Sequence, residues 1–107
     1  IKEAVDAYNS TIQSVANAKG LALVDVNQIL IDAASTGITF DEYFLNASLV
    51  FGGLVSLDGI HLTARGYAYM ANGFLQAIDE TYGSNFGESG NLAKAGNYPT
   101  NFSPTLR

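Results

Sequence analysis

The chain has 107 residues, a usual size for one small domain, and a formal net charge of −5. Hydrophobic residues make up 48% of it and charged residues 14%, which is enough apolar material for a core and is not typical of disorder. The acidic balance, with no basic run, argues against a nucleic acid as partner. No apolar run approaches the ~20 residues that span a bilayer. The lack of cysteine excludes disulfides and thiolate sites.

Residues 1 to 19 have the apolar periodicity of an amphipathic helix. The apolar positions, three or four residues apart, are Ile1, Val5, Tyr8, Ile12, Val15 and Ala16. Lys19 and Gly20 then supply a basic last turn and a left-handed stop. Because the periodicity starts at once, with no cap or initiator Met before it, we expect that a segment upstream was removed.

A nearly continuous apolar run over residues 21 to 26 follows, which is typical of a parallel strand buried on both faces. Helix followed by buried strand predicts an α/β protein. A lone strand cannot satisfy its ladder hydrogen bonds, so we expect its neighbours to lie outside this chain. Asp25 stands at the strand end, where ligand sites occur in α/β folds, but we favour a cap for a short helix over residues 27 to 34.

Residues 35 to 53 are punctuated by glycine, Asp and Asn, and predict irregular structure. Thr63 is a good N-cap for a helix that closes at Gly83. The apolar face of this helix comprises Tyr67, Met70, Ala71, Phe74, Leu75, Ile78 and Tyr82. Residues 84–107 are rich in Gly, Asn, Ser and Pro, and we predict a tail that is either ordered by contact or frayed. The resulting division is a domain portion over 1–83 and a tail over 84–107.

His61 is the single histidine, and Asp58 lies three residues before it in a glycine-containing turn ahead of the second helix. Such a turn can let the carboxylate accept the Nδ1 proton of the imidazole, which fixes the tautomer and leaves Nε2 to act as a base. The alternative is that Asp58 only caps a turn and His61 is a surface residue. By spacing alone, the pair is a weak signal.

The longer string from Ser56 to Ala71, SLDGIHLTARGYAYMA, resembles the C-terminal block of the SGNH (GDSL-like) hydrolases, in particular bacterial secreted or lipoprotein-like members. The resemblance covers most of residues 1 to about 83. It implies the C-terminal portion of a flavodoxin-like, three-layer α/β/α fold, with Asp58 and His61 as two members of a Ser-His-Asp triad. Leu62 replaces the proline that usually follows the histidine in this family.

The nucleophile block and the oxyanion-hole residues of that family have no match here. Ser56 lies in no nucleophile elbow, Ser10 and Ser14 fall within the first helix, and Ser84, Ser89 and Ser103 belong to the tail. A triad without its serine and oxyanion hole loses nearly all of its catalysis, so we expect the chain to be inactive alone. The serine would come from the N-terminal part of the same hydrolase, or from another chain of an oligomer.

The resemblance implies an exported ester hydrolase without a cofactor, acting on lipid acyl esters or acetylated carbohydrates. One histidine and dispersed carboxylates make no zinc set, so we predict no metal site. A non-catalytic alternative is a docking module in which the aromatic loop 37–59 contacts a partner. That loop carries Phe40, Tyr43, Phe44, Leu49 and Phe51.

For the remaining polar and aromatic residues that could belong to a site, we predict structural roles. We expect Asp41 and Glu42 to lie in a solvated loop, since adjacent acids diverge and make a poor paired-carboxylate site. The positive charge of Arg65 lies in the first turn of the second helix and opposes the helix dipole. We therefore expect its side chain to be solvated, with a salt bridge or a substrate contact as the alternatives. We assign Tyr67, Tyr69 and Phe74 to packing.

Overall fold

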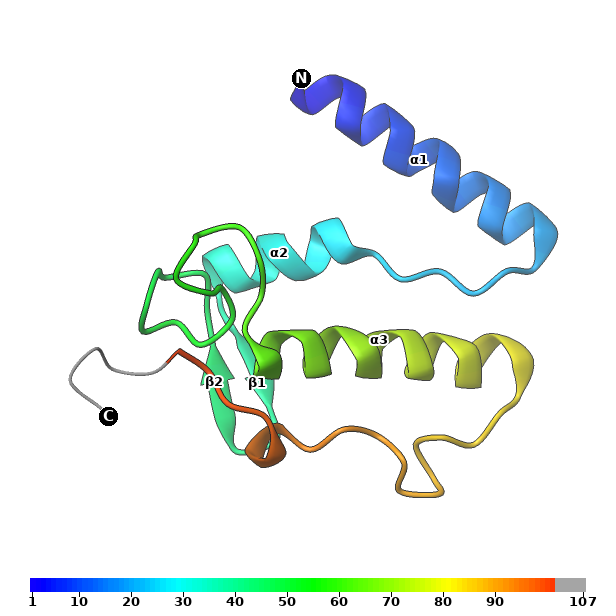
Figure 1. Ribbon diagram of the computed structural model, residues 1–107. Helices are drawn as coiled ribbons and strands as arrows, with labels where there is room; N and C mark the ends of the chain where they lie inside the picture. The colour runs from blue at the N-terminus through cyan, green and yellow to red at the C-terminus, as the bar shows by residue number, and fades with distance from the viewer. Residues whose placement is uncertain (102–107) are drawn as a thin grey trace.

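The computed structural model describes residues 1–101 and shows a mixed α/β chain. Three helices, α1 (Lys2–Lys19), α2 (Val26–Ser35) and α3 (Ala64–Tyr82), account for most of its regular structure (Figure 1). Strands β1 (Ile38–Phe40) and β2 (Tyr43–Leu45) pair as an antiparallel hairpin, and η1 (Ala95–Asn97) is a single 3-10 turn. Within residues 1–101, no helix is long and apolar enough to cross a membrane.

Four helix ends lie where local signals predict them: the starts of α2 and α3 and the ends of α1 and α3. Gly20 and Gly83 adopt the left-handed conformation that terminates α1 and α3. The Thr63 hydroxyl accepts the backbone N–H of Gly66, and the Asp25 carboxylate accepts that of Gln28, so both act as N-caps. The predictions for these helices, and for Asp25 as a cap, are confirmed.

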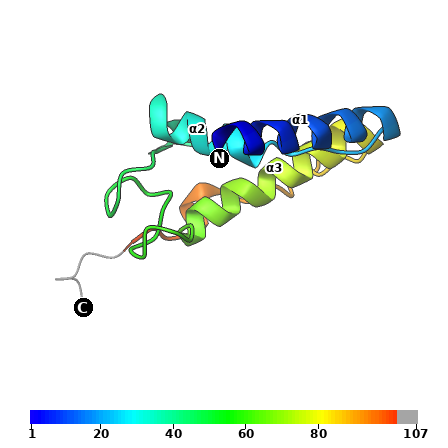
Figure 2. The ribbon, with the colours of Figure 1, turned by 90° about the horizontal axis from the view of Figure 1, so that it is seen from above.

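The strand predicted over residues 21–26 is wrong for the chain as it is folded here. Residues 21–25 run as an extended connection between α1 and α2 without belonging to any strand, and Val26 already starts α2 (Figure 1). The physical reason is the one that limits any isolated strand: no other segment of residues 1–101 pairs with it. The segment nevertheless lies between α1 and α3, as Figure 1 shows and as the view from above in Figure 2 agrees.

The hairpin corrects the prediction that residues 35 to 53 are irregular. Ile38 and Phe40 are buried while Thr39 between them is exposed, which is the alternation of a half-buried strand. Asp41 turns the chain with a left-handed φ of 54°, a conformation that Asp tolerates better than most residues. Asp41 and Glu42 are exposed as predicted, but the Asp41 carboxylate also accepts the backbone N–H of Ala95 at 2.7 Å.

The core lies between the hairpin, α2 and the first turns of α3. Its buried members are Ala33, Ile38, Phe40, Leu45, Leu54, Ala68 and Ala95. Tyr69 joins this core through an edge-on contact with Phe40, with the ring centroids 5.4 Å apart, which confirms its assignment to packing. The same assignment is wrong for Tyr67 and Phe74, each 52% exposed, because no described element covers their side of α3.

The described part of the tail, residues 84 to 101, is ordered by contact with α3. The Asn72 side chain donates to the carbonyl of Ala93 at 2.8 Å and accepts its N–H at 2.7 Å. Arg65 is not merely solvated: its Nε–H is shared between the carbonyls of Ala95 and Tyr98, and its guanidinium lies 3.7 Å from the ring centroid of Tyr43. Ser103 and the rest of the predicted tail lie outside the described residues.

Candidate active site

The loop that carries Asp58 and His61 is closed at its base by backbone pairing. Val55 and Leu62 form an antiparallel bridge, and Ser56 N–H donates to the carbonyl of His61 at 2.7 Å. Below this bridge, Leu54 is fully buried. The short loop therefore stands on the core and is fixed at both of its ends.

The turn within the loop brings Asp58 and His61 together. Gly59 adopts a φ of 72°, which an L-residue rarely takes, and its N–H donates to the carbonyl of Ser56 at 3.0 Å. This folds the chain back so that Asp58 Oδ2 lies 2.6 Å from His61 Nδ1. A carboxylate can only accept, so the imidazole Nδ1–H is the donor.

The second carboxylate oxygen of Asp58 is held by three further donors. Its Oδ1 accepts the Ser56 hydroxyl at 2.7 Å and the backbone N–H groups of Ile60 and His61 at 2.8 and 2.9 Å. The side-chain hydrogen bond from His61, and then these other donors, hold the pKa of the Asp58 carboxyl well below its usual range. The carboxylate is therefore ionised at neutral pH, oriented on one side by the loop backbone and directed at the imidazole on the other.

The imidazole itself is open to its surroundings. The His61 side chain is 69% exposed and that of Asp58 48% exposed. With Nδ1–H engaged by Asp58, the neutral ring presents an unprotonated Nε2, which can accept a proton from a hydroxyl group or a water molecule within hydrogen-bonding distance. The Asp58 carboxylate can therefore orient His61 as a general base and stabilise its protonated form.

No serine hydroxyl of residues 1–101 is hydrogen-bonded to His61. Ser56, the nearest in sequence, donates to Asp58 instead, so it supports the carboxylate. In the sequence, the only indication that Ser56 supports the carboxylate is its position two residues before Asp58. Ser84 donates to Asp79, and Ser89 donates to the carbonyl of Phe86.

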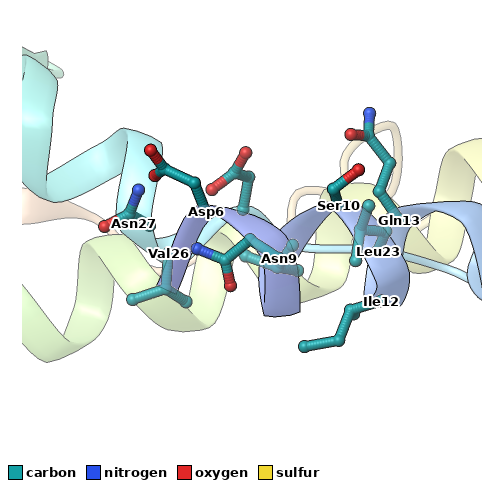
Figure 3. A pocket seen from close by; sticks show the side chains of 10 residues that line it. Asp6, Asn9, Ser10, Ile12, Gln13, Leu23, Val26 and Asn27 are labelled. Carbon is teal, nitrogen blue, oxygen red and sulfur yellow. The ribbon is translucent and has the colours of Figure 1, made fainter. Parts of the chain in front are cut away.

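Five surface hollows of the described chain lie away from the imidazole. The one in Figure 3 has a volume of about 330 Å³ and lies between α1 and residues 23 to 27. Four further hollows border the hairpin, the tail or α3, and neither Asp58 nor His61 lines any of the five. Among residues 1–101, no group of three or more His, Asp or Glu side chains could hold a metal ion.

No protein-family model, curated protein or solved structure matches the chain.

Proposed function

We propose that this chain supplies the acid and base of a serine ester hydrolase of the SGNH type, as the C-terminal part of its three-layer α/β/α domain. Asp58 orients His61, and His61 Nε2 removes the proton of a serine that stands on the N-terminal part of the same hydrolase. The observation that carries the proposal is the 2.6 Å contact between Asp58 Oδ2 and His61 Nδ1, with Nε2 left free. The substrate class is a carboxylic ester, either a lipid acyl ester or an acetylated carbohydrate, and the parent enzyme is exported.

In the first half of such a reaction, His61 Nε2 takes the serine proton as the serine oxygen attacks the ester carbonyl. The resulting imidazolium is stabilised by the Asp58 carboxylate, which stays ionised because the hydrogen bond from His61, and then its loop donors, favour the charged form and lower its pKa. His61 then gives the proton to the departing alcohol, and an acyl-serine remains. Water, deprotonated by His61, then attacks the acyl carbon, the bond between that carbon and the serine oxygen breaks, and His61 returns the proton to the serine as the acid leaves.

The test reconstitutes the enzyme from two polypeptides. The chain is mixed with the polypeptide encoded in frame before Ile1, and hydrolysis of 4-nitrophenyl acetate is followed. We expect no serine-dependent turnover by the chain alone, turnover by the mixture, and loss of turnover with His61→Ala. Glu88→Gln, an exposed change in the tail, serves as the matched control.

A covalent probe provides an independent readout. A fluorophosphonate labels an activated serine, and we expect labelling only on the added polypeptide and only with His61 present. Labelling of a serine of this chain alone, or full activity of the His61→Ala mixture, contradicts the proposal.

The second candidate is a docking module built on the loop 37–59, and one observation favours it. Phe44, Leu49 and Phe51 are 61%, 55% and 96% exposed, although Phe40 is buried. Substituting Phe51 by Ser separates the two candidates. A docking module loses its partner, whereas in the hydrolase the His61-dependent turnover of the mixture persists.

A further inference from the structure

We propose that Asn101 is a positioning residue for His61. It stands at the end of a strap, residues 93 to 101, and holds the base of the His61 loop (residues 56 to 61) through the backbone carbonyls of Val50 and Val55. The role in catalysis rests on the proposed function, whereas the support of the loop rests on contacts within the chain alone.

The side chains of the His61 loop are largely exposed. Leu57 and Ile60 are 57% and 80% exposed, although both are apolar, and the imidazole of His61 is open as well. A segment with few buried apolar contacts opens easily unless hydrogen bonds hold it. The position of His61 Nε2 therefore depends on the bonds at the base of the loop.

Backbone bonds at this base join the two arms of the loop to each other. The carbonyl of Leu54, for instance, accepts the N–H of Thr63 at 2.9 Å. The carbonyl of the next residue, Val55, accepts the side-chain amide of Asn101 at 2.9 Å instead. The Asn101 bond therefore ties the paired arms to a part of the chain that is distant in sequence.

The same amide also contacts a strained turn just before the loop. Val50 has a left-handed φ of 74°, which a β-branched residue rarely adopts and which persists only where neighbours hold it. The carbonyl of Val50 accepts Asn101 Nδ2 at 3.4 Å. One side chain therefore joins the two ends of the segment 50 to 55, which leads into the His61 loop.

The strap that carries Asn101 is anchored along α3. It starts where Ala93 pairs with the Asn72 side chain and runs back toward the start of the helix, as the orange-to-red segment in Figure 1 shows. There the N–H of Arg65, one of the first-turn groups that lack an intrahelical acceptor, donates to the carbonyl of Pro99 at 3.0 Å. The proline ring also restricts the backbone at this point. Because the strap is fixed two residues before Asn101, the amide reaches the loop with little freedom.

The position of His61 Nε2 matters because a general base acts only within hydrogen-bonding distance of the proton that it removes. A displacement of about 1 Å can cost about a hundredfold in rate. The contact between Asp58 and His61 forms inside the turn, so loss of the Asn101 bond should move the two residues together and leave the tautomer of the ring unchanged. We therefore expect this loss to lower kcat and to leave KM unchanged.

The test replaces Asn101 by Asp, which has the same shape but no donor, in the whole chain. Hydrogen exchange of the Ser56 amide, which donates to the carbonyl of His61, is measured by NMR. We expect this exchange to accelerate about tenfold relative to that of the amides in the middle of α2, because the base opens more often without the Asn101 bond. Asn101→Ala adds no charge and should act in the same way.

The matched control is Asn72→Asp. It removes the same kind of bond, from a side-chain amide to a backbone carbonyl, at the other end of the strap. Since the Arg65 contacts still hold the strap near Asn101, the Ser56 amide should not accelerate relative to those of α2.

The two-polypeptide assay supplies the catalytic readout. Asn101→Asp should lower kcat about tenfold to a hundredfold with KM unchanged, whereas Asn72→Asp should keep kcat. The ¹⁵N shifts of the His61 ring should keep the Nδ1–H tautomer in both variants. Equal acceleration of the Ser56 and α2 amides in Asn101→Asp, or a kcat equal to that of Asn72→Asp, overturns the inference, because Asn101 then only stabilises the fold. An effect of Asn101→Asp that Asn101→Ala lacks does so as well, since the added charge is then the cause.

Hydrogen exchange in the chain alone is independent of catalysis. If Asn101→Asp accelerates the Ser56 amide but the unmodified mixture shows no turnover, the proposed function fails and the support of the loop by Asn101 stands. If the unmodified mixture hydrolyses the ester and Asn101→Asp changes neither exchange nor kcat, the proposed function stands and the inference fails.

Discussion

The hydroxyl of Thr63 donates a 2.6 Å hydrogen bond to the carbonyl of Gly53 and at the same time accepts the N–H of Gly66. One buried side chain thus caps α3 and fixes the segment that leads into the His61 loop. The bond spans ten residues of sequence.

Replacing Thr63 by Ala should remove both bonds. We expect the free energy of unfolding to fall by about 2–3 kcal/mol, because a lost N-cap costs about 1 kcal/mol and a buried unpaired carbonyl adds about 1–2 kcal/mol. Urea denaturation followed by circular dichroism measures the change. Thr63→Ser keeps the hydroxyl and should lose much less; equal losses in the two variants would contradict the role of the hydrogen bonds.

Asp58→Asn should alter the tautomer of His61 without unfolding the chain. The amide oxygen can still accept the loop N–H groups, but the negative charge that holds the Nδ1–H is gone. We expect the ¹⁵N shifts of the ring to show a larger Nε2–H population. In the two-polypeptide enzyme, turnover should fall by up to about 10⁴-fold. Ser56→Ala removes only one donor to the carboxylate and should leave the tautomer unchanged.

The lowered pKa of Asp58 predicts how the loop responds to acid. Because the folded-state pKa is lower than the ordinary value of about 3.9, the carboxylate contributes stability that is fully present above that value and is lost as the pH falls toward the folded-state pKa. The carboxyl group of Asp58, followed by the ¹³C shift of its carboxyl carbon, should therefore show no protonation step above about pH 4 and should protonate only in stronger acid. In urea, the Asp58 carboxyl should titrate near its ordinary value. An Asp58 titration at the ordinary value in the folded chain would contradict the hydrogen-bond network.

Two glycines of α3 should respond to alanine with opposite signs. A Cβ at Gly66 would lie 2.6 Å from the Leu54 carbonyl oxygen and 3.1 Å from the Leu62 Cβ, so Gly66→Ala should cost about 1–3 kcal/mol of stability. A Cβ at Gly73 would meet only Val24, at 3.7 Å, and Gly73→Ala should stabilise α3 by up to about 1 kcal/mol. Thermal denaturation of both variants measures the pair. Destabilisation by Gly73→Ala would show that α3 and segment 21–25 pack more tightly than the structure describes.

The helices can be predicted because their signals are local. Thr63, Asp25, Gly20 and Gly83 act within a few residues of their own positions, and the periodicity between them identifies the apolar faces. The contact between Asp58 and His61 is local as well, since three residues and one left-handed glycine suffice to form it.

The features that cannot be predicted depend on partners far away in the sequence. Local reasoning leaves Arg65 in solvent because its acceptors are carbonyls 30 and 33 residues later. The hairpin carries no clear sequence signal because its turn uses Asp41 in place of a glycine. The run over residues 21–26 has the composition of a strand, but strand formation needs a neighbour that no pattern inside the run can provide.

The side chain of Asn101 donates to the carbonyl of Val55 at 2.9 Å, at the base of the His61 loop. Asn101 is therefore synthesised 46 residues after Val55, the residue that it helps to hold. During synthesis on the ribosome, the loop of Asp58 and His61 emerges before Asn101, so this hydrogen bond can form only after residue 101 has been made. A product that stops before Asn101 keeps the local contact between Asp58 and His61 but carries it on a loop whose base lacks the bond from Asn101 to Val55.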